Sequence, residues 1–92
     1  MERLSDDEIE ANLEGLEWER RGDAIERELE RESFAEAIAF VNAVADLAER
    51  HDHHPDVLVH SYRKVRLTVT THSVGGLTAR DFALAAAIDG LG

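Results

Sequence analysis

Apolar residues in the first part of the chain recur at helical spacing: Ile9, Leu13 and Leu16. Ser5 precedes this stripe and Glu8 follows three residues later, which is the pattern of a capping box at the start of a helix. Gly15 is a residue type that commonly ends a helix, because it adopts positive φ without strain. We therefore predict a short helix over residues 5–14.

The spacing then changes to two, which is typical of strands. Leu16 and Trp18 alternate with charged residues, and Ile25 and Leu29 do the same after the turn sequence Arg21-Gly22-Asp23. We predict an antiparallel hairpin with Leu16 and Trp18 on the inner face of its first strand. The second strand should expose a row of like charges, which predicts a clear gain of stability in molar salt. This row consists of Glu26, Glu28, Glu30 and Glu32.

A second helix is predicted over residues 33–50, with Ser33 and Glu36 as a second capping box. Its apolar stripe consists of Phe34, Ile38, Val41, Ala45 and Ala48, and Ala37 widens it. Phe40, Val44 and Leu47 extend the apolar arc beyond what contact with one sheet needs. The helix is therefore expected either to be nearly central or to contact a second subunit.

The second half of the chain repeats the order of two strands and a helix. One strand begins at Val57 after a polar loop, and the other runs from Val65 to His72 with regular alternation. Thr78 is predicted to cap a last helix whose apolar stripe consists of Leu84, Ala85, Ile88 and Leu91. The order α-β-β-α-β-β-α predicts a single α+β domain over residues 1–92 with a four-stranded antiparallel sheet.

Composition narrows the function classes. The chain carries 20 acidic residues against 9 arginines and one lysine, a formal net charge of −10, which argues against binding to nucleic acid or to anionic membranes. The acid excess has two open interpretations, adaptation to high salt and an ordinary acidic protein from an arginine-preferring genome. The absence of cysteine excludes disulfides and thiolate chemistry. No apolar leader or membrane-spanning run is present, so we expect a cytoplasmic protein.

Histidine is the residue type most suggestive of chemistry, since four of the five histidines lie between positions 51 and 60. His51 and His60 are interpreted as solvated side chains. His53, His54 and His72 leave three alternatives open from spacing alone: loop histidines, a metal site and acid/base groups. Three carboxylates near them would individually be assigned to the surface: Glu49, Asp52 and Asp81.

Several short motifs together resemble the pterin-4a-carbinolamine dehydratase family. They are His53-His54-Pro55, Thr71-His72 and Gly76-Leu77-Thr78 with Asp81, preceded by Trp18 and the stretch from Phe34 to Glu49. The resemblance covers about residues 4–91. It implies that three helices pack on one face of the sheet and that the chain forms a homodimer or homotetramer.

The resemblance also implies an activity, a carbon–oxygen lyase that dehydrates 4a-hydroxy-tetrahydropterin to quinonoid dihydropterin. The implied catalytic residues are His53, His54 and His72, with His53 and His72 in acid/base roles and His54 in positioning and proton relay. The implied substrate-binding residues are Glu49, Asp52, Pro55, Thr71 and Asp81. No metal and no cofactor are expected, because the tetrahydropterin is itself the substrate. The alternative is a pterin-binding or protein-interaction module. The resemblance allows such a module to be linked to molybdopterin metabolism.

Overall fold

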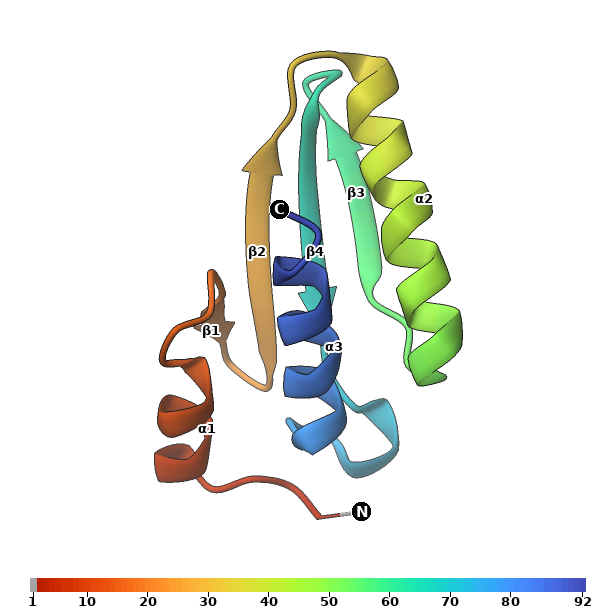
Figure 1. Cartoon of the computed structure of the whole chain (residues 1–92). Coiled ribbons are helices and arrows are strands. Elements are labelled where there is room, and N and C mark those ends of the chain that lie inside the picture. The colour runs from red at the N-terminus through yellow and green to blue at the C-terminus, as the bar shows by residue number, and fades with distance from the viewer. Residues whose placement is uncertain (1) are drawn as a thin grey trace.

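Three helices and four strands follow one another in the predicted order α-β-β-α-β-β-α (Figure 1). The computed structural model describes residues 2–92. Its elements are α1 (Asp6–Leu13), β1 (Glu19–Arg21), β2 (Ala24–Glu30), α2 (Phe34–His51), β3 (Asp56–His60), β4 (Lys64–Val69), the 3-10 turn η1 (His72–Val74) and α3 (Ala79–Asp89). Within these residues no helix is long and apolar enough to cross a membrane.

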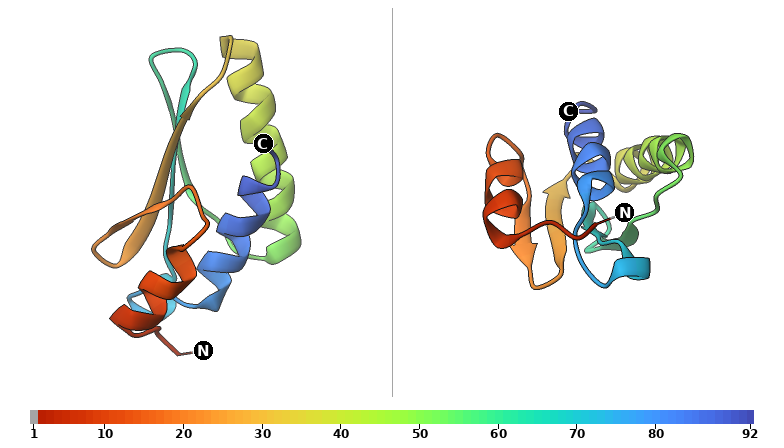
Figure 2. Two further views of the ribbon diagram at one scale, coloured as in Figure 1. Left: turned by 60° about the vertical axis from the view of Figure 1, so that its left-hand side comes forward. Right: turned by 90° about the horizontal axis from the view of Figure 1, so that it is seen from below.

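The four strands form one antiparallel sheet in the order β1-β2-β4-β3, and the helices lie on one of its faces (Figures 1 and 2). The predicted hairpin is present as β1–β2, a second hairpin is formed by β3–β4, and β2 pairs with β4 in the middle of the sheet. Val65, Leu67 and Val69 alternate along β4 and are fully buried under the helices. This confirms the predicted fold class, because a period of two buries one face of a strand and exposes the other.

The helix caps agree with the sequence pattern. Ser5 forms a complete capping box with Glu8, and Thr78 forms one with Asp81. The Ser33 hydroxyl accepts the backbone N–H of Glu36 at 3.1 Å, but the Glu36 carboxylate faces that hydroxyl instead of the backbone of Ser33. The second predicted capping box is therefore only half formed.

The predicted buried stripe of α2 is wrong in phase. Phe34 is 55% exposed and Ala45 is exposed, whereas Phe40 and Val44 belong to the core. The core positions of this helix are Ala37, Phe40, Val44 and Ala48. Phe40 and Val44 are thus not available for contact with another subunit. The apolar arc is so broad that hydrophobic periodicity fits two neighbouring phases equally well, and burial of the bulky Phe40 decides between them.

Three element ends also differ from prediction. β1 begins only at Glu19, because the segment before it is attached to α3: the Glu17 N–H and the Trp18 indole N–H both donate to Asp89, at 2.9 and 2.8 Å. β4 ends at Val69, and His72 begins the 3-10 turn instead of continuing the strand. Leu91 lies beyond α3 and is 41% exposed.

The outer face of the sheet carries the predicted glutamates of β2, but each has a cation beside it. Guanidinium groups approach Glu26, Glu28 and Glu30 at 3.7, 3.2 and 3.5 Å, and they come from Arg21, Arg66 and Arg63 respectively. Glu32 lies beyond the end of the strand. The expected row of unscreened like charges is therefore neutralised locally by neighbouring arginines.

Candidate active site

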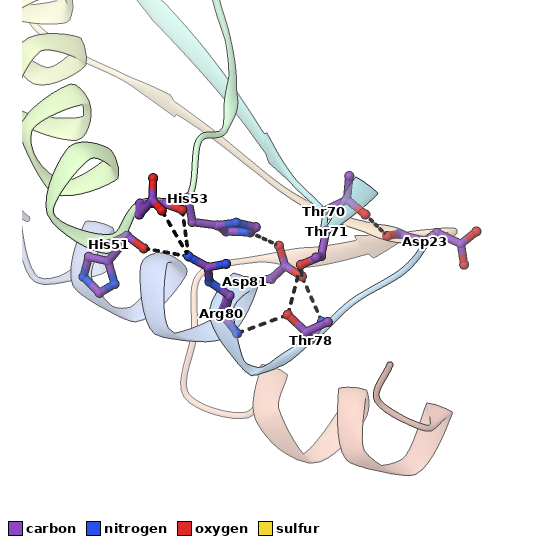
Figure 3. Close-up of polar contacts among 9 residues, drawn as sticks. Asp23, His51, His53, Thr70, Thr71, Thr78, Arg80 and Asp81 are labelled. Carbon is purple, nitrogen blue, oxygen red and sulfur yellow. Dashed lines mark hydrogen bonds and ion pairs between the residues drawn. The ribbon is translucent and has the colours of Figure 1, made fainter. Parts of the chain in front are cut away.

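A fully buried carboxylate, Asp81, is the centre of the polar network at the start of α3 (Figure 3). It is the third residue of the helix, where its capping-box role places the carboxylate against the Thr78 backbone N–H, at 2.9 Å from Oδ2. The Thr71 hydroxyl donates to the same oxygen at 2.8 Å. The helix N-terminus and these donors make an otherwise costly buried charge tolerable.

The two threonines fix the direction of their hydrogen bonds. Because Thr71 donates its only hydroxyl proton to Asp81, the 2.9 Å contact between the two hydroxyls must be donated by Thr78. The Thr78 hydroxyl oxygen in turn accepts the backbone N–H of Arg80 at 3.2 Å. Oδ2 of Asp81 is therefore saturated by ordered donors, and Oδ1 is left to face His53.

His53 is the histidine that the fold encloses. Its Nε2 lies 2.6 Å from Asp81 Oδ1, and its side chain is only 10% exposed (Figure 3). An imidazole nitrogen is a stronger base than a carboxylate oxygen, so the shared proton belongs to Nε2. Within residues 2–92, no fully enclosed side-chain nitrogen or oxygen lacks a hydrogen-bond partner, and Nδ1 of His53 has none. Nδ1 is therefore not completely enclosed, and it is the ring nitrogen left without a protein partner among residues 2–92.

A sharp turn after α2 aims His53 at α3. Asp52 adopts the left-handed conformation, with φ 48° and ψ 45°, and the His53 N–H returns to the Ala48 carbonyl at 3.1 Å. This pattern is a Schellman motif, which ends a helix and reverses the chain. The Arg80 guanidinium donates to the carbonyls of His51 and Asp52, at 3.3 and 2.8 Å. The predicted binding residue Asp52 thus forms the turn, while its carboxylate is 90% exposed.

His54 faces a different partner from its neighbour. Its Nε2 lies 3.1 Å from Glu49 Oε2 in the last turns of α2, and both side chains are largely exposed. An ion pair of this kind contributes little to stability. His54, Glu49 and Pro55 border an apolar hollow of ≈ 180 Å³ between α2 and β3, which Val41 and Val57 also line. The structure thus offers His54 an open surface instead of an enclosed contact.

His72 is exposed and lies at the start of η1, directly after Thr71. Thr71 pairs with Gly76 through two backbone hydrogen bonds, at 3.1 and 3.4 Å, so the four residues between them form a closed loop. Gly75 has a φ of 65°, a conformation that glycine adopts without strain. The backbone of His72 is thereby attached to the Asp81 network, although no side-chain hydrogen bond or ion pair joins His72 to another predicted site residue within residues 2–92.

The structure therefore sorts the predicted site residues into three groups. His53, Thr71 and Asp81 form one buried network, and Glu49, His54 and Pro55 lie at the apolar hollow. Asp52 and His72 are attached to the network only through the backbone. Sequence reasoning missed Arg80 and gave Thr78 only a capping role. The adjacency of Arg80 to the capping residue Asp81 was the one signal that could have suggested it.

The remaining two histidines, His51 and His60, lie outside the predicted site and contact other parts of the fold. His51 is the last residue of α2, and its carbonyl accepts from Arg80. His60 is not simply solvated, because its ring bonds the Glu28 carboxylate across the sheet. Over residues 2–92, no three histidine or carboxylate side chains converge in an arrangement that could hold a metal ion.

The chain is similar to known proteins over nearly its whole length. The family model described as pterin 4 alpha carbinolamine dehydratase matches residues 2–91. A relative from Nocardia farcinica is 50% identical over 91 residues, covering 98% of this chain and 95% of its own. Another from Roseiflexus sp. strain RS-1 is 52% identical over 88 residues, covering 95% and 94%. Both are named as pterin-4-alpha-carbinolamine dehydratases, with a qualifier that marks the activity as inferred.

Solved structures give the same result for the fold. A crystal structure from Brucella melitensis, described as a transcriptional coactivator/pterin dehydratase, has a TM-score of 0.91 and 31% identity, with 98% of both chains covered. A pterin dehydratase-like protein described as a RuBisCO assembly factor in the alpha-carboxysome has a TM-score of 0.66 and 22% identity, with 87% and 92% covered, and shares the fold. From the family match over nearly its whole length and these relatives, the chain belongs to the pterin 4 alpha carbinolamine dehydratase family.

Proposed function

We propose that the protein dehydrates a 4a-hydroxy-tetrahydropterin to the quinonoid dihydropterin. The single observation that carries the proposal is the enclosed His53–Asp81 pair, which orients one imidazole and leaves its Nδ1 without a hydrogen-bond partner among residues 2–92. Membership of the dehydratase family supplies the substrate class. A histidine oriented by a buried carboxylate is a common arrangement for moving protons near neutral pH.

The proposed reaction needs two proton transfers. The bond between C4a and its hydroxyl breaks, and the hydroxyl leaves as water after receiving a proton. A ring N–H of the pterin loses a proton, and its electron pair forms the new C=N bond. With Nε2 donating to Asp81, the neutral His53 ring has its acceptor lone pair at Nδ1, which suits removal of the ring proton. The family resemblance assigns the other transfer to His72.

Among the remaining predicted residues, two are proposed to bind the substrate around these two groups. His54 and Glu49 lie at the rim of the apolar hollow, where they could hold polar edges of a flat heterocycle. Thr71 and Asp81 act by holding His53, and not by direct contact with the pterin, because both are buried. We propose that histidines alone carry the protons, with no metal and no cofactor besides the pterin substrate.

A second candidate function is a protein-interaction module. It is favoured by the similarity to the Brucella protein, which is described as a transcriptional coactivator as well as a pterin dehydratase. Homo-oligomer formation and a cytoplasmic location stay predictions for this chain. Light scattering at micromolar concentration tests the first, and the mass of a single chain would contradict it. Fractionation of expressing cells tests the second.

The decisive experiment is a dehydratase assay with synthetic 4a-hydroxy-tetrahydropterin. His53→Ala and His72→Ala should each lower kcat by about 10²- to 10⁴-fold, the range for loss of one acid/base group. His51→Ala and His60→Ala are the matched controls and should retain wild-type rates. Equal effects of all four substitutions would refute the assigned roles. Activity that a chelator abolishes and zinc restores would refute the metal-free mechanism.

A further inference from the structure

Arg80 is the charged side chain of the network that the proposed chemistry does not use. We propose that it is a positioning residue, which holds the turn after α2 so that His53 keeps the orientation needed for proton transfer. This inference rests on the proposed dehydratase function. Among residues 2–92, the Arg80 side chain forms no hydrogen bond or ion pair with His53 or Asp81, and its hydrogen bonds lead to the backbone of the turn.

The contacts of Arg80 are with carbonyl oxygens. One terminal nitrogen of its guanidinium donates to His51 O at 3.3 Å and to Asp52 O at 2.8 Å (Figure 3). Its distance to the Asp52 carboxylate is 4.0 Å, and that carboxylate is 90% exposed. The guanidinium therefore acts by hydrogen bonding to the main chain and not as part of an ordinary surface ion pair.

The two carbonyls are groups that need a partner. They lie at the C-terminal end of α2, where the last carbonyls of a helix have no partner within it and carry the negative end of the helix dipole. A guanidinium is the side chain best suited to this place, since it offers several donors and a permanent charge. Arg80 thus stabilises the end of α2 where the chain turns.

The turn contains one strained backbone conformation besides its own two hydrogen bonds. Asp52 has positive φ, a conformation that costs a non-glycine residue free energy and persists only when its surroundings enforce it. The carbonyl of this residue receives the shorter Arg80 bond, and the next residue is His53. Two consecutive residues of α3 therefore form hydrogen bonds with two consecutive residues of the turn. Arg80 holds the Asp52 backbone, and Asp81 holds the His53 ring.

The test compares Arg80→Met, which keeps the apolar stem and removes every donor, with Arg80→Lys, whose single ammonium replaces the guanidinium. Arg50→Met is the matched control, because it removes an exposed arginine at the same end of α2. We expect Arg80→Met to lower kcat by about 10- to 100-fold with KM within about twofold of wild type, because a small misplacement of a reacting group costs rate and not binding. Arg80→Lys should recover part of kcat, and Arg50→Met should match wild type.

A wild-type kcat in folded Arg80→Met, or a change confined to KM, would overturn the proposal. If Arg80→Met does not fold, wild type and Arg80→Lys are compared instead, and an unchanged kcat overturns it. ¹⁵N NMR of the His53 ring separates this inference from the proposed function. The Nε2–H signal should be protected from exchange in wild type and lose protection in the Arg80 variant even if the wild type dehydrates no pterin. Unaltered protection would refute the inference without bearing on the activity.

Discussion

Each end of α3 contains a carboxylate that accepts several hydrogen bonds, but the donors differ between the two ends. Near its start, Asp81 accepts from the Thr71 hydroxyl, the Thr78 backbone and His53 Nε2. At its end, Asp89 accepts from the Glu17 backbone, the Trp18 indole and Arg27, the last two at 2.8 Å. Each carboxylate thus has three donors and joins α3 to segments far away in the sequence.

What differs is whether the network can change its charge. No donor to Asp89 among residues 2–92 changes its protonation near neutral pH. Arg27 among them is a permanent cation, and its side chain is only 13% exposed. Asp81 instead faces an imidazole whose second nitrogen has no hydrogen-bond partner among residues 2–92. A carboxylate with three donors therefore stabilises the fold at one end of the helix, and at the other end it is proposed to orient a proton-transfer group. Hydrogen bonding to a carboxylate does not by itself distinguish scaffold from chemistry.

The largest expected effect on catalysis at this helix comes from Asp81→Asn. The amide keeps the shape of the side chain and removes the charge that fixes the Nε2–H form of His53 and would stabilise its protonated ring. We expect kcat in the dehydratase assay to fall by about 10²-fold or more. Retention of more than half of wild-type kcat in folded protein would place the chemistry elsewhere.

Asp89→Asn should have the opposite signature. It removes the charge facing the largely buried Arg27 side chain, so we expect a loss of about 1–3 kcal/mol in the free energy of unfolding. The measurement is urea denaturation, with the exposed Asp46→Asn on α2 as a control expected to be nearly neutral. kcat of Asp89→Asn should match wild type. A drop of kcat comparable to that of Asp81→Asn would erase the distinction between the two ends.

A third carboxylate, Glu28 on the outer face of the sheet, extends the series to an exposed group. The hydrogen bond from His60, helped by the Arg66 guanidinium, holds the pKa of Glu28 below its ordinary value. A carboxyl group with a lowered pKa in the folded state stabilises the protein above its unfolded-state pKa and loses that contribution as pH falls through the folded-state pKa. Between about pH 6 and pH 3, wild type should therefore lose more thermal stability than Glu28→Gln. Parallel melting curves across that range would show that the pair contributes nothing.

The smallest effect is expected from salt. The arginines beside Glu26, Glu28 and Glu30 already offset the repulsion that the sequence predicts for β2. Sodium chloride screens these attractions together with the remaining repulsion from the net charge of −10. The rise in Tm from low salt to 1 M should thus be smaller than the loss caused by Asp89→Asn. A larger rise would favour adaptation of the chain to high salt.

Local signals made most of the fold predictable. The caps at Ser5 and Thr78 and the alternation along β4 depend on residues within a few positions of one another, and the structure contains all of them. The phase of α2 was not predictable in this way, because apolar residues occur on most of its circumference. Burial of Phe40 in place of Phe34 depends on how the helix packs against the sheet and α3.

The site was predictable as a set of residues but not as an arrangement. The family motifs pointed to His53 and Asp81, yet their contact spans 28 positions and follows from the turn at Asp52. Apart from its adjacency to Asp81, Arg80 left no sequence pattern to detect, since its partners are backbone carbonyls that every residue possesses. Whether the exposed histidines His54 and His72 meet the substrate depends on the bound complex, which residue spacing does not encode.

The sequence separations of the contacts at the two ends of α3 also bear on the order of folding. His53 and Asp81 are 28 positions apart, whereas Trp18 and Asp89 are 71 apart. Closing the longer loop costs about 0.8 kcal/mol more chain entropy, by the logarithmic dependence on loop length. We expect the segment from His53 to Asp81 to become ordered early and the hydrogen bond between Trp18 and Asp89 to form late. Release of residues 17–18 from Asp89 could then occur as a separate local fluctuation that leaves the histidine network intact.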